Sequence, residues 1–178
     1  MKYLFALLLT TTLFACQKNI DELPDATQTG TNKFGANING KYWMPQGFGV
    51  VPTAPILEAN FAGSNSIRIN ARNFGSSPTE TEMEIIIYNI TGPGTYLLNQ
   101  NTSKYPNFSA SYGYYVERRF TPKYEWITSE KHTGKVEVTR YDIAAKIISG
   151  TFEFTAKENS DATSPLSVTE GRFDLPIQ

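Results

Sequence analysis

Hydrophobic and polar residues alternate with a period of two over much of the chain after residue 33, which is typical of half-buried β-strands. The alternation is clearest around Phe152, where one face would carry Ile148, Phe152, Phe154 and Ala156. The opposite face would carry Ser149, Thr151, Glu153 and Thr155. This region contains no convincing amphipathic-helix pattern, so the pattern predicts an all-β domain.

Eleven short segments rich in β-branched and aromatic residues, and separated by Gly, Pro and Asn, are predicted to be strands. They are residues 34–38, 41–44, 56–62, 66–74, 82–90, 94–98, 108–120, 124–128, 134–141, 147–157 and 167–177. Many short strands without helices predict an antiparallel β-sandwich or a partly closed barrel of about 9–11 strands. Little or no helix is expected outside the N-terminal signal peptide.

Two local signals predict backbone irregularities. Asn39-Gly40 lies between two predicted strands and favours a type I′ hairpin turn, whose two central residues need a positive φ. In the last strand, the apolar positions change phase across Glu170-Gly171, which predicts a β-bulge.

The register between two of the strands follows from their apolar and charged residues. A three-residue loop at 143–145 would place Val136 opposite Phe152 and Lys135 opposite Glu153. This register is self-consistent, because an apolar residue then faces an apolar one and opposite charges face each other.

The first 15 residues have the character of a secretory signal peptide rather than of a membrane-spanning helix. Lys2 precedes an apolar run at residues 3–14, which is shorter than the roughly 20 residues needed to span a bilayer. The junction LFAC at residues 13–16 resembles the lipobox of bacterial lipoproteins, although Phe14 is bulkier than the usual residue at that place. The resemblance implies cleavage before Cys16 and acylation of its sulfur and amine, which would hold the protein on a membrane.

The sequence divides into a signal peptide at residues 1–15, a lipidated cysteine with a flexible tether at 16–33, and a single all-β domain at 34–178. Gln17 is not the Asp that retains lipoproteins in the inner membrane of some bacteria. The resemblance therefore implies an outer-membrane protein, anchored on the periplasmic or the cell-surface side.

Composition and charge exclude several classes of function. The chain has 16 Lys+Arg and 17 Asp+Glu, a net charge of −1, which does not favour nucleic acid as a partner. One cysteine and one histidine exclude a disulfide scaffold and a Cys/His zinc site. No GxSxG, HExxH, P-loop or CxxC motif is present, and His132 lies in a predicted turn. We therefore expect no catalytic residue, no cofactor and no metal site.

Carboxylates remain as the residues that could support catalysis, because glycoside hydrolysis uses a pair of them. The candidates are Glu80, Glu82, Glu84, Glu117 and Glu125. The first three alternate at the start of a strand, and exposure at a sheet rim would explain this pattern. Glu125 lies across a tight turn from Arg118 and Arg119, one of which is expected to form an ion pair with it.

The densest unusual feature is an aromatic segment at residues 112–126. By alternation, Tyr112, Tyr114 and Val116 would face the core. The candidate ligand-binding residues are the outward-facing Tyr115, Glu117 and Arg119, with Tyr124 and Trp126 of the following strand. Such residues can form a platform for a glycan or a protein. The alternative is that the tyrosines only cover the sheet, with arginine stems packed over them.

Several segments resemble a recurring pattern in small lipoproteins of the Bacteroidota that are known only as domains of unknown function. They are residues 37–43, 135–142, 147–156 and 168–174. The resemblance covers the start of the domain and its last third. It implies a fold and a location but no activity, because the matching motifs are structural.

These observations together predict a lipid-anchored envelope protein with a non-enzymatic binding or structural role. Its partners would be the membrane, through the anchor, and a glycan or protein ligand, with the oligomeric state left open. One alternative is a cell-surface glycan-binding module that uses exposed aromatic residues. Another is a carboxylate-dependent glycan hydrolase, with two carboxylates about 5–9.5 Å apart in a deep cleft. A closed barrel with a dry cavity would instead indicate a carrier of lipids or small ligands.

Overall fold

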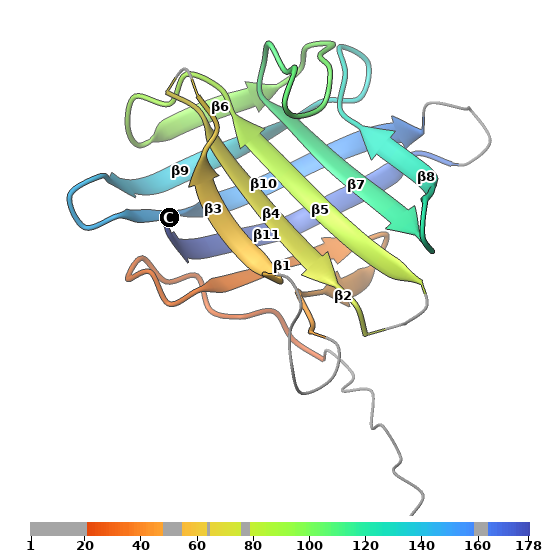
Figure 1. Cartoon of the computed structure of the whole chain (residues 1–178), viewed down its shortest axis with the longest axis horizontal. Coiled ribbons are helices and arrows are strands. Elements are labelled where there is room, and N and C mark those ends of the chain that lie inside the picture. The colour runs from red at the N-terminus through yellow and green to blue at the C-terminus, as the bar shows by residue number, and fades with distance from the viewer. Residues whose placement is uncertain (1–20, 48–54, 64, 76–78, 159–163) are drawn as a thin grey trace, which may run out of the picture.

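The computed structural model describes residues 21–47, 55–63, 65–75, 79–158 and 164–178. This part of the chain contains no helix, and its eleven strands form one antiparallel sheet that is not closed (Figure 1). The strands are β1 (Lys33–Ile38), β2 (Lys41–Trp43), β3 (Leu57–Phe61), β4 (Ile67–Asn73), β5 (Glu80–Ile87), β6 (Gly94–Leu98), β7 (Tyr112–Arg118), β8 (Pro122–Ile127), β9 (Gly134–Asp142), β10 (Ile147–Glu158) and β11 (Leu166–Pro176). Each corresponds to one of the predicted segments, and the all-β prediction is confirmed.

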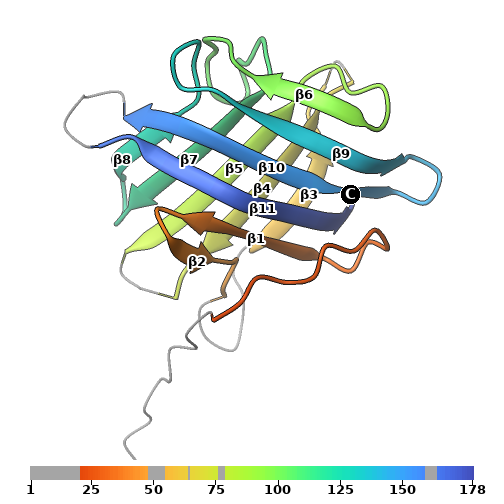
Figure 2. The same ribbon diagram turned by 180° about the vertical axis from the view of Figure 1, so that it is seen from behind.

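The sheet folds over on itself into two layers. Neighbouring strands follow the order β2-β1-β11-β10-β8-β7-β5-β4-β3, with β9 beside β10 and β6 beside β9. Strand β10 joins the layers, since most of it pairs with β9 and β11 whereas Lys157 and Glu158 pair with β8. We call the layer of β6, β9, β10, β11, β1 and β2 sheet A, and the layer of β3, β4, β5, β7 and β8 sheet B. The two layers cross face to face, as in the predicted sandwich (Figures 1 and 2).

The side chains between the two sheets are apolar and almost free of solvent. The ring of Phe152 packs against Phe34, with 5.2 Å between ring centroids, and against Phe154 and Phe173, each at 6.4 Å. Gly171 lies opposite Phe152, where a Cβ would come within 2.5 Å of the ring, so this close approach requires glycine. The predicted core face of β10 is confirmed by the burial of Ile148, Phe152, Phe154 and Ala156.

The predicted backbone irregularities are present. Asn39 and Gly40 form the two-residue turn between β1 and β2, with φ angles of 50° and 84°. The register of β11 against β10 shifts next to Glu170, whose φ angle is 54°. Both the type I′ signal and the phase change in the apolar pattern were therefore informative.

The predicted register between β9 and β10 is confirmed, although the connecting loop differs. Lys135 pairs with Glu153, and the apolar pair beside them is also formed. The loop has four residues rather than three, because Asp142 already pairs with Ile147. A shift of register before Gly150 compensates for the additional residue.

Asp174 of β11 holds the segment that precedes β1. Its carboxylate accepts hydrogen bonds, at 2.6 to 3.2 Å, from Thr27, Thr29, Gly30, Thr31 and Ser149. Burial opposes ionisation of Asp174, but these hydrogen bonds outweigh it and hold the pKa of the carboxyl group well below its usual range. The segment is thus fixed to sheet A by a buried charge.

The domain therefore begins before the predicted boundary at residue 34. Pro24 lies so close to Gly35 that a Cβ there would be 2.8 Å from its ring, and Arg172 donates a hydrogen bond to the carbonyl of Pro24. From about residue 23 onward, the predicted tether packs on the domain instead of extending as a flexible linker. The predicted signal peptide, Cys16 and residues 17–20 lie outside the described residues.

Candidate functional site

The predicted aromatic platform is not exposed. Tyr115 and Trp126 point between the two sheets, where they are 5% and 6% exposed and their rings lie 5.7 Å apart. The ring of Tyr124 is half-buried against Trp126, with 5.9 Å between centroids. Glu117 is half-buried and only Arg119 is fully exposed. These five residues therefore do not form one ligand-binding surface.

The exposure of Tyr115 was predicted wrongly because β7 is apolar on both faces. Tyr112, Tyr114 and Val116 were expected in the core between the sheets, but they lie on the outer face of sheet B. There they are still buried, in a second small cluster with Ile86 and Phe108. Alternation cannot identify the inner face of a strand when both faces are covered.

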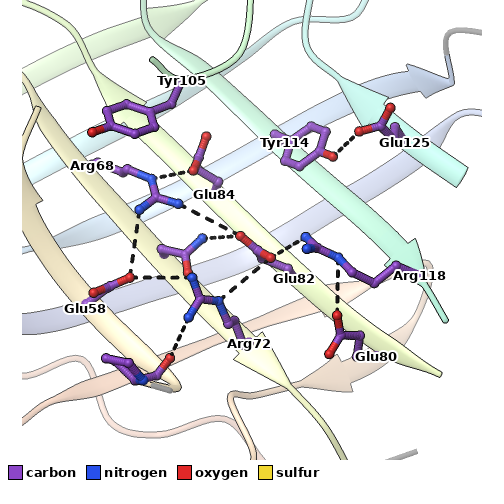
Figure 3. A network of polar contacts seen from close by, with 12 residues as sticks. Glu58, Arg68, Arg72, Glu80, Glu82, Glu84, Tyr105, Tyr114, Arg118 and Glu125 are labelled. Atoms are coloured by element: carbon purple, nitrogen blue, oxygen red, sulfur yellow. Dashed lines mark hydrogen bonds and ion pairs between the residues drawn. The ribbon is translucent and has the colours of Figure 1, made fainter. Parts of the chain in front are cut away.

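The outer face of sheet B carries a network of charged side chains (Figure 3). We call it the sheet-B network; its members are Glu58, Arg68, Asn70, Arg72, Glu80, Glu82, Glu84 and Arg118. Its arginines and asparagine on β4 alternate with Ile67, Ile69 and Ala71, which are fully buried in the core. The pleat of β4 therefore places all three polar residues beside the glutamates of β5.

Glu82 and Glu84 of β5 are buried ion-pair partners and not a solvent-exposed rim, so the rim interpretation is wrong for both, whereas Glu80 at the start of the strand is half-buried beside Arg118. Glu82 accepts hydrogen bonds from Asn70 and Arg118, and Arg72 lies 3.8 Å away. Glu84 accepts a hydrogen bond from Arg68. These contacts compensate the charges that burial removes from water.

Arg68 lies in the middle of the sheet-B network. Burial alone would lower its pKa, but the neighbouring Glu84, Glu58 and Glu82 outweigh that effect and raise the pKa. Its guanidinium group also lies 4.8 Å from the centroid of the Tyr105 ring, in a cation–π contact.

The loop between β6 and β7 is fixed over one end of this network. Tyr112 donates a hydrogen bond to Glu84 and accepts one from the backbone of Tyr105 at 2.7 Å. Burial, and next the charge of Glu84, raise the pKa of Tyr112 far above its usual value. Lys104 pairs with Glu125, so the expected pairing of that glutamate with Arg118 or Arg119 is wrong.

The outer face of sheet A is open by comparison. It contains two adjoining hollows of about 420 and 390 Å³, which share Lys135 and Glu153. We call them together the sheet-A groove. The polar side chains that line it are Thr133, Lys135, Glu137, Thr151, Glu153, Thr155, Ser167, Thr169, Glu170 and Arg172.

The charges in the sheet-A groove form exposed ion pairs. Lys135 Nζ lies 3.2 Å from Glu137 and 3.7 Å from Glu153, and all three side chains are at least 41% exposed. Hydrogen bonds from Thr95 and Lys135 lower the pKa of Glu137. Solvent weakens the mutual attraction of these exposed charges.

A family model for a domain of unknown function, DUF6252, matches residues 30–174 of the chain. The chain belongs to the DUF6252 family. The match includes the sheet-B network, Asp174 and the residues of the sheet-A groove other than Ala26, and it confirms the expectation of an uncharacterised family. No curated protein and no solved structure gives a significant match.

Within the described residues, the DUF6252 domain has no group of three or more His, Cys, Asp or Glu side chains arranged to hold a metal ion. A search of the same residues finds no helix with the length and hydrophobicity needed to cross a bilayer. His132 is half-buried in the turn before β9, where its backbone N–H bonds the hydroxyl group of Ser129.

The sequence analysis did not predict that polar residues of several strands gather on each outer face of the DUF6252 domain. Both faces are nevertheless visible in the sequence as alternating polar residues. Arg68, Asn70 and Arg72 alternate with apolar residues, and so do Glu82 and Glu84 on the neighbouring strand. The polar face of β10 was assigned correctly, but the hollows beside it are also lined by residues of β9, β11 and the segment before β1. How these elements come together cannot be read from alternation alone.

Proposed function

We propose that this chain is a lipid-anchored envelope protein whose domain binds a glycan across the sheet-A groove, without catalysing a reaction. The observation that carries the proposal is the pair of adjoining hollows over β9, β10 and β11. Their size lies in the range of ligand-binding sites. Their polar side chains lie on the outer face of sheet A and are not part of the apolar packing between the two sheets.

The chemistry of the sheet-A groove matches sugar hydroxyl groups. Thr151, Thr155 and Thr169 offer hydroxyls that both donate and accept hydrogen bonds, Lys135 donates, and Glu153 accepts. Binding would rest on these polar contacts, because the aromatic platform predicted for stacking on sugars is buried. The outer face of sheet B is a weaker candidate, since its charged groups already bond one another.

The resolved pKa shifts offer the hydrolase alternative no support. A glycan hydrolase needs one carboxylic acid with a raised pKa as the general acid. Among the described residues, the carboxyl groups with clear shifts are Glu125, Glu137, Asp142 and Asp174, and all four pKa values are lowered.

The anchor would keep the domain close to the membrane. Cys16 precedes Leu23, where the packed segment begins, by seven residues. Seven residues span at most about 25 Å even when fully extended. A lipidated Cys16 would therefore hold the sheet-A groove within a short distance of the envelope surface.

Two measurements test the proposal. Retardation of the full chain in gels that contain soluble polysaccharides would detect glycan binding, and the double variant Lys135→Ala/Glu153→Ala should abolish it. The matched control Lys41→Ala/Glu130→Ala removes one exposed charge of each sign outside the groove and should migrate like the wild type. Absence of retardation across neutral and acidic polysaccharides would contradict glycan binding.

Anchoring is tested by cell fractionation. Cys16→Ser removes the only thiol in the chain, so the variant should leave the membrane fraction and accumulate in soluble form. Continued co-sedimentation of Cys16→Ser with membranes would show that the anchor is elsewhere.

A further inference from the structure

The hairpin between β7 and β8 ends in an unusually exposed aromatic side chain. Phe120 is 92% exposed, more than any other large hydrophobic side chain of the described residues. Its φ angle is 133°, a conformation that is unfavourable for a bulky L-residue.

Two cations flank Phe120 at this tip. Arg119 and Lys123 are both exposed, and no ion pair to either is found within the described residues. Lys123 instead extends over the ring of Tyr124, at 4.8 Å from its centroid. The neighbouring Arg118 is different, because Glu80 and Glu82 hold it in the sheet-B network.

One exposed aromatic side chain between two cations fits a lipid surface better than a protein partner. A stable protein interface buries about 800 Å² on each partner, far more than one projecting side chain supplies. A bilayer surface needs only a ring that enters the acyl boundary and cations that contact phosphate groups.

The proposed anchor would also keep the tip near a membrane. In Figure 1 the β7–β8 turn lies at the right edge of the molecule and the first described residues lie at its lower edge. The distance from Cys16 to the packed segment at Leu23 is at most about 25 Å. An anchored domain therefore stays close to the bilayer, and its β7–β8 tip can turn toward the surface.

We propose that the β7–β8 tip docks on an anionic phospholipid surface, with Phe120 inserted below the headgroups and Arg119 and Lys123 on their phosphates. The proposal rests on the proposed anchor at Cys16, which brings the tip to the surface. The tip would then act as a second, weak membrane contact that fixes the orientation of the domain.

Quenching by brominated lipids tests this contact on the full acylated chain in vesicles that contain phosphatidylglycerol. The indole introduced by Phe120→Trp should lose emission when the acyl chains carry bromine, measured relative to the wild type with its buried Trp43 and Trp126. The matched control is Phe61→Trp, at an exposed phenylalanine on the β3–β4 hairpin, and its emission should not change.

The role of the cations is tested in the same vesicles. Adding Arg119→Ala and Lys123→Ala to Phe120→Trp should reduce the quenching, as should neutral vesicles or high salt. Equal quenching of Phe120→Trp and Phe61→Trp, or none in either, would overturn the proposed contact. The anchor is measured separately, by flotation of the protein with the vesicles, which depends on Cys16 and not on Phe120.

Discussion

The outer faces of the two sheets carry similar residues in different environments. On sheet B the side chains of Glu82 and Glu84 are 11% and 7% exposed, whereas on sheet A those of Lys135 and Glu153 are 43% and 58% exposed. Both faces place glutamates beside cations on neighbouring antiparallel strands. The residue types alone therefore do not determine which face is covered and which is open to solvent.

The difference arises from what covers each face. The β6–β7 loop lies over sheet B, where Tyr105 contacts Arg68 and Lys104 pairs with Glu125. On sheet A, the segment before β1 reaches only the border of the groove, at Ala26. Breaking a covered ion pair leaves a buried charge without a partner and therefore destabilises the fold. An ion pair that is exposed to solvent contributes little to stability.

The largest loss of stability is expected from removing a buried ion-pair partner on the outer face of sheet B. Glu82→Ala would leave Arg118 and Asn70 without their main acceptor and Arg72 without its nearest carboxylate on β5. Removing one partner of a buried ion pair destabilises a protein by about 3–5 kcal/mol. Urea unfolding should show this loss, and a loss below about 1 kcal/mol would contradict the structural role of the sheet-B network.

The sequence predicted the fold well because strand patterning and turn chemistry are local. The turn at Asn39-Gly40, the bulge at Glu170 and the Lys135–Glu153 register each depend on a few residues close together in the chain. The start of the domain was placed too late because Asp174 binds the segment before β1 from the far end of the sequence.

The candidate site was predicted less well, for a reason that Tyr115 illustrates. Its strand has apolar residues on both faces, so the periodicity is the same whichever face points inward. The choice depends on the β6–β7 loop, which buries Tyr112 on the outer side. The position of that loop depends on contacts with other strands and cannot be derived from alternation.

An intermediate effect is expected at the border of the open face, where Asp174 holds the segment before β1. Asp174→Asn should cost about 1.5–3 kcal/mol at pH 7, since hydrogen bonds to a charged acceptor are lost. The folded-state pKa of Asp174 is lowered, so its stabilisation is complete above the unfolded value of about 3.9 and is lost as the pH falls through the folded value. Urea midpoints of wild type and variant should therefore converge in acid, and a constant difference would contradict this assignment.

The smallest effect on stability should come from the open face itself. Lys135→Ala/Glu153→Ala removes the exposed ion pairs of Lys135 with Glu137 at 3.2 Å and with Glu153 at 3.7 Å, and solvent screening leaves such pairs little net effect on stability. The variant should therefore unfold at nearly the wild-type urea concentration, in contrast to Glu82→Ala, although both changes remove a glutamate from a central strand. A loss comparable to that of Glu82→Ala would mean that the sheet-A groove is also structural. An unchanged stability together with lost polysaccharide retardation would instead assign the exposed charges to ligand binding, because only an open face can change its partners without unfolding the sheet.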